Sequence, residues 1–141
     1  MKSSIFAGVL LVSASLVSVE GQSWVEFQQK HINAGMTPDK CTKVITDRKI
    51  VTPPNRCKVF NTFITQNVNA VPAVCAGGGT LYGNGYTISN ATFNIIDCTQ
   101  QNQNQVPPVV PPKCLYNGTA STKRIIVRCE KKKPVHFHGT K

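Results

Sequence analysis

Polar and apolar positions near the start of the chain follow helical spacing over residues 23–35 (SWVEFQQKHINAG). Three ring-bearing side chains recur there at intervals that place them on one helical face, namely Trp24, Phe27 and His31. Ser23 and Glu26 form the S-x-x-E pattern of a helix start, and Gly35 suits the helix end. His31 is therefore expected to face the body of the protein.

Two shorter segments also have helical character. Residues 39–50 (DKCTKVITDRKI) predict a second short helix, in which Val44 and Ile45 face inward. Residues 72–75 (PAVC) predict the end of a third helix. Between these two segments, the sequence TPPN at 52–55 breaks the regular structure, because proline lacks the backbone N–H that helices and sheets need.

Strand patterns dominate the second half of the chain. They occur at 57–65 (CKVFNTFIT), 86–98 (YTISNATFNIIDC), 123–129 (KRIIVRC) and 134–139 (PVHFHG). Because side chains alternate along a strand, the first segment is expected to carry four of them on one face: Lys58, Phe60, Thr62 and Ile64. Three helices and at least five strands predict an α+β fold, with helices set against an antiparallel sheet.

The segments between these elements read as loops and turns. Residues 76–85 (AGGGTLYGNG) predict a glycine-rich loop, which is not a phosphate-binding P-loop because no Gly-Lys-Ser/Thr follows. Residues 99–112 (TQQNQNQVPPVVPP) predict a polar, proline-rich surface loop. A turn is expected at Asn117-Gly118, and EKKK at 130–133 is expected to be a tight basic connection.

The start of the chain has the pattern of a secretory signal peptide. Lys2 precedes the apolar run IFAGVLLVSASLV, which is shorter than a membrane-spanning helix and rich in serine. We expect cleavage after Gly21, which leaves one secreted domain over residues 22–141. The alternative is an uncleaved membrane anchor.

Six cysteines lie in the expected mature chain: Cys41, Cys57, Cys75, Cys98, Cys114 and Cys129. An even number in a secreted chain predicts three disulfides, although the sequence alone does not choose among the pairings. No C-x-x-C pair of a zinc site is present. Asn90 and Asn117 begin N-x-Thr sequons and are candidate glycosylation sites.

The charge is strongly positive. The formal net charge is +10, and it stays at that value when the expected signal peptide leaves with Lys2 and Glu20. Such an excess predicts an anionic partner: nucleic acid, an anionic glycan or a membrane surface. The competing interpretation is a basic surface that is simply solvated.

Three motifs now stand in order along the cysteine framework: FQQKHI at 27–32, CKVFNTF at 57–63 and PVHF at 134–137. Together they closely resemble the pancreatic ribonuclease (ribonuclease A) superfamily over the whole mature chain. With six cysteines the chain looks like an amphibian or angiogenin-like member. The resemblance implies a monomer with three helices packed on a bent antiparallel sheet. It also implies the disulfide pairs Cys41–Cys98, Cys57–Cys114 and Cys75–Cys129.

The resemblance implies cleavage of single-stranded RNA after pyrimidines through a 2′,3′-cyclic phosphate, with no metal and no cofactor. It assigns His31 as the base, His136 as the acid and Lys58 as the cation that stabilises the transition state. The residues that it places around the substrate are Lys30 at the phosphate, Asn61 as a structural residue, Thr62 and Phe137 at the pyrimidine, and Glu130 at the following base. A threonine hydroxyl both donates and accepts, so it suits uracil and cytosine alike.

One position departs from the family pattern. His138 stands where many members carry an aspartate that orients the acid. Since alternation places His136 and His138 on the same strand face, a protonated His138 is expected to lower the pKa of His136 and weaken catalysis. A rival interpretation is a zinc site formed by His31, His136 and His138.

Two other functions remain open from the sequence. The first is a cationic host-defence protein, in which Lys131, Lys132 and Lys133 bind microbial or cell surfaces and RNA cleavage is incidental. The second is an angiogenin-like signal that enters cells through a basic loop such as DRKI at 47–50.

Overall fold

The computed structural model describes residues 23–141, so the expected signal peptide at 1–21 lies outside the described residues. In this part of the chain the α-helices are α2 (Trp24–His31) and α3 (Cys41–Asp47), and the 3-10 helices are η1 (Pro38–Lys40) and η2 (Pro72–Cys75). The strands are β1 (Val51–Thr52), β2 (Arg56–Cys57), β3 (Phe60–Ile64), β4 (Gly79–Gly83), β5 (Tyr86–Ser89), β6 (Phe93–Gln100), β7 (Tyr116–Lys123), β8 (Ile125–Glu130) and β9 (Lys133–Thr140).

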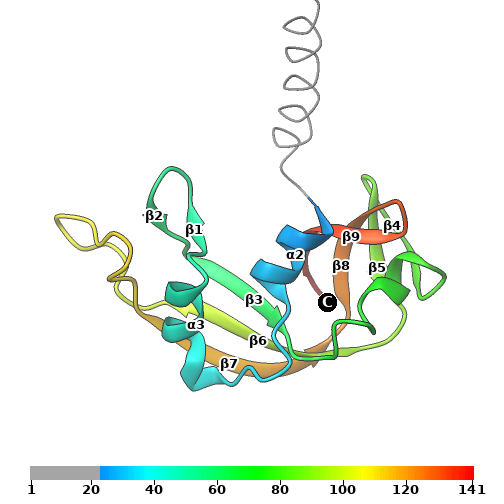
Figure 1. Cartoon of the computed structure of the whole chain (residues 1–141), viewed down its shortest axis with the longest axis horizontal. Helices are drawn as coiled ribbons and strands as arrows, with labels where there is room; N and C mark the ends of the chain where they lie inside the picture. The colour runs from blue at the N-terminus through cyan, green and yellow to red at the C-terminus, as the bar shows by residue number, and fades with distance from the viewer. Residues whose placement is uncertain (1–22) are drawn as a thin grey trace, which may run out of the picture.

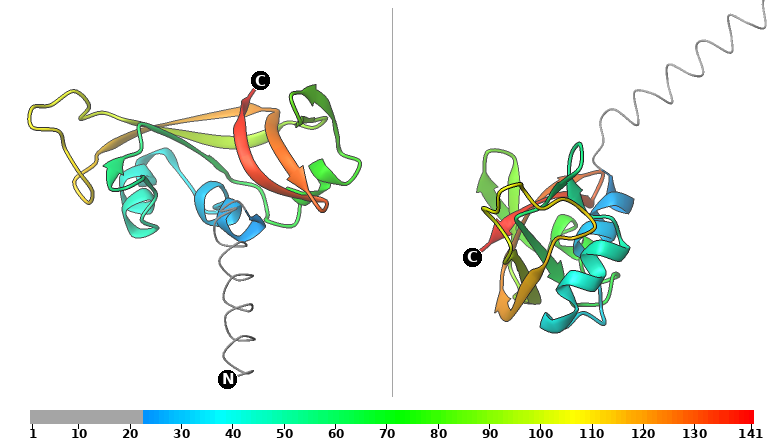
Figure 2. Two further views of the ribbon diagram at one scale, coloured as in Figure 1. Left: turned by 90° about the horizontal axis from the view of Figure 1, so that it is seen from above. Right: turned by 90° about the vertical axis from the view of Figure 1, so that its left-hand side faces the viewer.

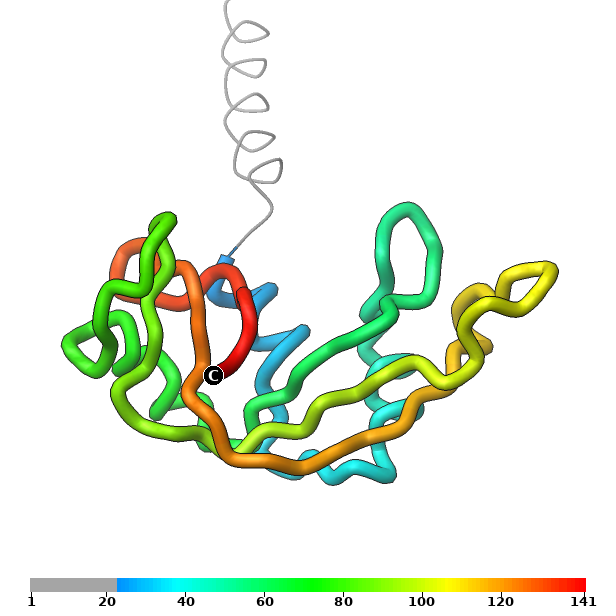
Figure 3. Tube along the Cα trace, turned by 180° about the vertical axis from the view of Figure 1, so that it is seen from behind, coloured from blue at the N-terminus to red at the C-terminus, as the bar shows by residue number. Residues whose placement is uncertain are grey.

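The described strands form two main antiparallel sheets and one small hairpin. The first sheet has the order β3-β6-β7, the second has the order β4-β5-β8-β9, and β1 pairs with β2. Figure 1 shows the two sheets as the arms of a bent molecule, with α2 between them and α3 against the first sheet. Seen from behind, β6 and β7 run side by side along the lower edge before the chain rises into β8 (Figure 3).

Helix α2 begins at the expected residue but ends earlier than expected. Ser23 caps it, since its Oγ accepts a hydrogen bond of 3.1 Å from the Glu26 backbone N–H. The helix ends at His31 rather than at Gly35, because Ile32 is extended and forms a parallel bridge with Ile64 of β3. This bridge ties the helix that carries His31 directly to the central strand.

The expected third helix does not form, and the number of α-helices among the described residues is two. Residues 72–75 make only the 3-10 turn η2, after which Gly78 packs tightly against Ala73. A Cβ at Gly78 would lie 2.7 Å from the Ala73 carbonyl oxygen, so the chain turns sharply there. The glycine-rich segment that follows is a strand, β4, rather than the expected loop.

Two further sequence predictions are wrong in detail. Residues 86–98 form two strands, β5 and β6, which belong to different sheets and are separated by residues 90–92. Asn117-Gly118 is not a turn but part of β7. The glycine is explained by packing, because a Cβ at Gly118 would lie within 2.6 Å of the backbone of Pro38 in η1. The surface loop expected at 99–112 does form, but it covers residues 101–115, because Thr99 and Gln100 end β6. Figure 2 shows this loop at one end of the molecule.

Two buried apolar clusters pack the helices onto the two sheets. The first packs α3 onto the β3-β6-β7 sheet around Ile45, Phe63 and Ile96, and the second packs α2 and η2 between the sheets around Phe27, Ile64 and Ile95. The disulfides Cys41–Cys98 and Cys57–Cys114 lie in the first cluster, and Cys75–Cys129 borders the second. These are the pairs that the family resemblance implied. Each closes a loop of more than fifty residues, and in the chain-entropy account each contributes about 4 kcal/mol.

Within residues 23–141, no helix is both long enough and apolar enough to cross a bilayer.

Candidate active site

A cleft of about 160 Å³ lies where α2, β9 and the segment before β3 meet. Its lining residues are Glu26, Phe27, Lys30, His31, Lys58, Val135, His136 and Phe137. The three residues that the sequence analysis assigned to catalysis are therefore brought together from positions up to 105 residues apart in the chain. The cations outnumber the single carboxylate, so the cleft suits an anionic group.

His31 is fixed in one orientation by a hydrogen bond and by ring packing. Its Nδ1 lies 2.9 Å from the backbone oxygen of Thr62, and its ring stacks on Phe137 at a centroid distance of 4.8 Å. Because a carbonyl oxygen can only accept, Nδ1 carries the hydrogen and donates it. The other nitrogen, Nε2, then holds a lone pair that can take a proton.

The surroundings of His31 keep it neutral in the free protein. The pKa of His31 is lowered from 6.5 to about 3, chiefly by burial. The bond to Thr62 opposes this shift, and the cations Lys58 and Lys30, together with His136, add to it. An anionic phosphate in the cleft would offset the repulsion between these cations and a protonated ring. The free side chain is therefore ready to accept a proton, and a bound phosphate strengthens it as a base.

Lys58 reaches the cleft from the segment that precedes β3 rather than from the strand itself, so it does not share a strand face with Thr62 as expected. Its Nζ donates to Asn61 Oδ1 at 2.7 Å, and Asn61 Nδ2 donates to the Lys30 backbone oxygen at 2.9 Å. Tyr116 fixes the Lys58 backbone with a hydroxyl bond of 2.6 Å. Burial, and the charge of Lys30, lower the pKa of Lys58 to about 8, so the ammonium form still dominates at pH 7.

Thr62 lies on β3 and is 2% exposed. Its hydroxyl donates to Asp97 Oδ1 at 2.7 Å, and Asp97 is its antiparallel partner on β6. The sequence analysis missed Asp97, since only the strand register brings it to Thr62. While the hydroxyl donates to Asp97, its oxygen lone pairs remain able to accept a hydrogen bond from a ligand.

His136 lies on β9 opposite Arg128 of β8. The pKa of His136 lies below 6.5, mainly because the residue is partly buried. The charges of nearby residues lower this pKa as well, in the order Arg128, His138, Lys58 and Lys30. His138 acts on the pKa of His136 in the expected direction, but the charge of Arg128, which the sequence analysis overlooked, has the larger effect. The weaker catalysis expected from His138 stays a prediction.

An aromatic residue that the sequence analysis also missed holds this cluster together. The Tyr86 ring lies 4.1 Å from the His138 ring and 6.3 Å from the His136 ring, between centroids. The guanidinium carbon of Arg128 lies 4.8 Å from the Tyr86 centroid, a cation–π distance. Tyr86, Arg128 and His136 occupy one row across β5, β8 and β9.

Glu130 ends β8 as an exposed residue outside the cleft lining, so its contact with the base that follows the cleaved bond stays a prediction. The zinc interpretation, by contrast, does not match this geometry. In the described part of the chain, no three histidine, cysteine or acidic side chains are grouped as a metal site would require. The alternative zinc site at His31, His136 and His138 is therefore not formed.

Comparison with known proteins shows which family this chain resembles. Residues 22–138 match the family model described as pancreatic ribonuclease. The pancreatic ribonuclease of Iguana iguana is 36% identical over 120 residues, which cover 82% of this chain and 96% of that protein. The oocytes ribonuclease of Aquarana catesbeiana is 33% identical and covers 98% of this chain and 94% of its own. The X-ray structure of zebrafish RNase5 superimposes with a TM-score of 0.75 at 33% identity, over 82% of this chain and 91% of that chain.

Proposed function

Because the chain belongs to the pancreatic ribonuclease family, we propose that it is a secreted, monomeric endoribonuclease that cleaves single-stranded RNA after pyrimidines. The observation that carries this proposal is the shared cleft of His31, Lys58 and His136. The proposal includes removal of residues 1–21 on secretion, and it treats the exposed sequons Asn90 and Asn117 as glycosylation sites.

The reaction begins with proton transfer to His31. Its Nε2 takes the proton of the ribose 2′-hydroxyl, and the oxygen attacks the adjacent phosphorus. The bond from phosphorus to the 5′-oxygen breaks, and protonated His136 gives its proton to that oxygen. Lys58 stabilises the negative charge that builds on the phosphoryl oxygens, and Lys30 adds to the positive potential. The product is a 2′,3′-cyclic phosphate, which water opens when the two histidines exchange roles.

The base before the cleaved bond is held by Thr62 and Phe137. The Thr62 hydroxyl accepts from N3–H of uracil when it donates to Asp97, and it must turn away from Asp97 to donate to N3 of cytosine. Phe137, which already stacks on His31, supports the ring of the base.

The test is cleavage of defined dinucleotides. The protein is incubated with UpA, CpA, GpA and the DNA analogue of UpA, in the presence and absence of a chelator, and the products are resolved by mass spectrometry. We expect cyclic phosphates from UpA and CpA, much less from GpA, none from DNA, and no effect of the chelator. Absence of cleavage of every RNA, or loss of activity on chelation, would overturn the proposal.

Substitution of Asp97 is expected to change the choice between pyrimidines. In Asp97→Ala the Thr62 hydroxyl loses its acceptor, so its preference for accepting from uracil weakens. We expect the UpA to CpA ratio of kcat/KM to fall roughly tenfold, the size of one charge-assisted hydrogen bond. Competition kinetics with both substrates measures this ratio directly. An unchanged ratio would separate Asp97 from base recognition.

The pH profile is expected to respond to the row of residues beside His136. Since His136 must be protonated to act as the acid, its lowered pKa places the alkaline limb of kcat/KM below the usual 6.5. Arg128→Gln removes a positive charge and His138→Asp adds a negative one, so in both variants the pKa of His136 rises and the alkaline limb moves to higher pH. The measurement is kcat/KM for UpA from pH 4 to 9, with Lys113→Gln as the exposed control. An alkaline limb that stays in place in both variants contradicts this account.

A second function is favoured by one observation. Lys131, Lys132 and Lys133 are all exposed where β8 turns into β9, and they extend the basic surface beyond the cleft. This surface suits anionic glycans or membranes, as a host-defence protein requires. The discriminating variant is the double substitution His31→Ala, His136→Ala. Bacterial killing or vesicle binding that persists in this variant would assign those effects to the surface and not to RNA cleavage.

A further inference from the structure

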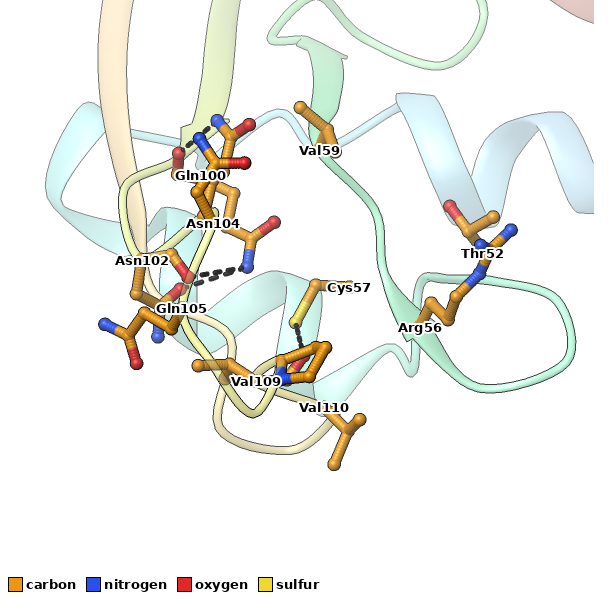
Figure 4. A pocket seen from close by; sticks show the side chains of 12 residues that line it. Thr52, Arg56, Cys57, Val59, Gln100, Asn102, Asn104, Gln105, Val109 and Val110 are labelled. Carbon is orange, nitrogen blue, oxygen red and sulfur yellow. Dashed lines mark hydrogen bonds between the residues drawn. The ribbon is translucent and has the colours of Figure 1, made fainter.

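A second and larger cavity lies at the end of the first sheet, outside the catalytic cleft. It has a volume of about 510 Å³ and lies between the β1-β2 hairpin and the surface loop that begins after β6. Figure 4 shows Thr52 and Arg56 on one side, a group of carboxamide side chains on the opposite side, and Val109 and Val110 below. We call it the amide pocket, after Gln100, Asn102, Gln103, Asn104 and Gln105 in its lining.

One wall of the amide pocket is held by hydrogen bonds within the loop, whereas several polar side chains in the pocket lining make none. The Asn102 side chain bridges the loop, donating to the Lys113 oxygen at 3.0 Å and accepting from the Leu115 N–H at 3.1 Å. In residues 23–141, no side-chain hydrogen bond or ion pair engages Arg56, Asn104 or Gln105. Carboxamides offer donors and acceptors together, and Arg56 is the one charged side chain among the described lining residues.

This chemistry fits a nucleotide. The edge of a nucleobase presents donors and acceptors that amides pair with, its faces are apolar like the valines of the pocket floor, and its phosphate suits a guanidinium. The cavity is lined by no acidic residue within the described part, so nothing there repels a polyanion.

The direction of the RNA places its upstream part at this end of the sheet. Thr62 is proposed to hold the base before the cleaved bond, while His136 on β9 protonates the leaving oxygen, so the 5′ part of the RNA must run away from β9. Along β3 that direction leads from Thr62 past the half-exposed Phe60 to Val59, which lines the amide pocket. The distance is about 10 Å at strand spacing. Figure 1 shows the β1-β2 hairpin and the 101–115 loop at the end of the molecule opposite β9.

We propose that the amide pocket binds one nucleotide of the RNA upstream of the cleaved bond, with the base against Asn104 and Gln105 and its phosphate at Arg56. The proposal rests on the proposed ribonuclease function. It makes the protein prefer RNA with a 5′ extension over the minimal dinucleotide, even though the extension takes no part in the reaction.

The experiment compares kcat/KM for UpA with that for UpA extended by three nucleotides on its 5′ side, at one fixed low salt concentration. A second set of substrates carries an abasic residue at each upstream position in turn. The variant is Asn104→Asp, Gln105→Glu, which keeps the shape of both side chains but adds charge that repels RNA. The matched control is Asn67→Asp, Asn69→Asp, which adds the same charge in the exposed segment between β3 and η2.

We expect the extension to raise kcat/KM roughly tenfold for the wild type and the control. One abasic position should remove most of that gain, and the pocket variant should lose it while cleaving UpA normally. Equal rates on UpA and the extended RNA, or a gain that the pocket variant keeps, would overturn the inference. The inference would also be overturned if the increase in kcat/KM survived an abasic residue at every upstream position, since the increase would then come from the phosphates alone. Failure to cleave even UpA would instead overturn the proposed function.

Discussion

Cleavage of UpA falls by about three to four orders of magnitude when His31 is replaced by alanine. The substitution removes the group whose free Nε2 takes the proton of the 2′-hydroxyl, and the one other imidazole among the described lining residues, His136, is the acid that protonates the leaving oxygen. Lys58 and His136 remain, so binding of the RNA is largely retained and the loss appears in kcat. Single-turnover kinetics at saturating UpA measures it, and a loss confined to KM would show that His31 serves binding only.

The variant His31→Gln separates a chemical role from a structural one. A glutamine amide can still donate to the Thr62 oxygen but cannot accept the 2′ proton. The stability of the His31→Gln protein at acid pH provides a second, independent test of whether His31 is neutral in the folded protein. Because the pKa of His31 is about 3 in the folded protein and 6.5 in the unfolded chain, the unfolded state binds the extra proton between these values.

The free energy of unfolding of the wild type therefore falls as the pH drops from about 6.5 towards 3, by up to a few kcal/mol. His31→Gln lacks this titration, so it is expected to be inactive and yet less sensitive to acid than the wild type. Urea unfolding at pH 7 and pH 4 measures the difference. If both proteins lose the same free energy of unfolding between these pH values, His31 is not held in its neutral form in the folded protein.

Local patterns in the sequence were enough to predict the elements that carry the catalytic residues. The apolar face of Trp24, Phe27 and His31 placed α2 on the body of the protein, and the alternation around Thr62 identified β3. What local patterns did not show is where an element ends when a distant segment decides it. Helix α2 ends early because Ile32 pairs with Ile64, and Gly118 stays in a strand because η1 packs against it.

The same limit applies to the candidate site. His31, Lys58 and His136 were assigned from motifs, but their neighbours Asp97, Tyr86 and Arg128 belong to no motif. Asp97 meets Thr62 through the register of β3 and β6, and Tyr86 and Arg128 meet His136 through the row across β5, β8 and β9. Sheet register is set by non-local pairing, so these contacts become visible only in the folded structure.

Lys58 is the remaining residue whose loss is expected to be large. Its ammonium group is half-buried and held by Asn61 at 2.7 Å, so it is already in position when charge builds on the phosphoryl oxygens. Removing one such fixed donor lowers kcat by about 10² to 10³-fold. We therefore expect Lys58→Met to lose that factor in kcat for UpA with a small change in KM, whereas the exposed Lys113→Met should behave as the wild type.

The form of the loss distinguishes transition-state stabilisation from simple attraction of the RNA. If Lys58 acted only through long-range attraction, Lys58→Met would raise KM, leave kcat unchanged, and lose its effect at high salt. Lys58→Arg keeps the charge but not the compact ammonium geometry, so it should recover only part of kcat. Because the pKa of Lys58 is lowered to about 8, the alkaline decline that deprotonation of His136 begins should become steeper near pH 8 in the wild type, and Lys58→Arg should lack that second step. Full activity in Lys58→Met would contradict this role of Lys58 and would leave Lys30 as the one lysine among the described residues that line the cleft.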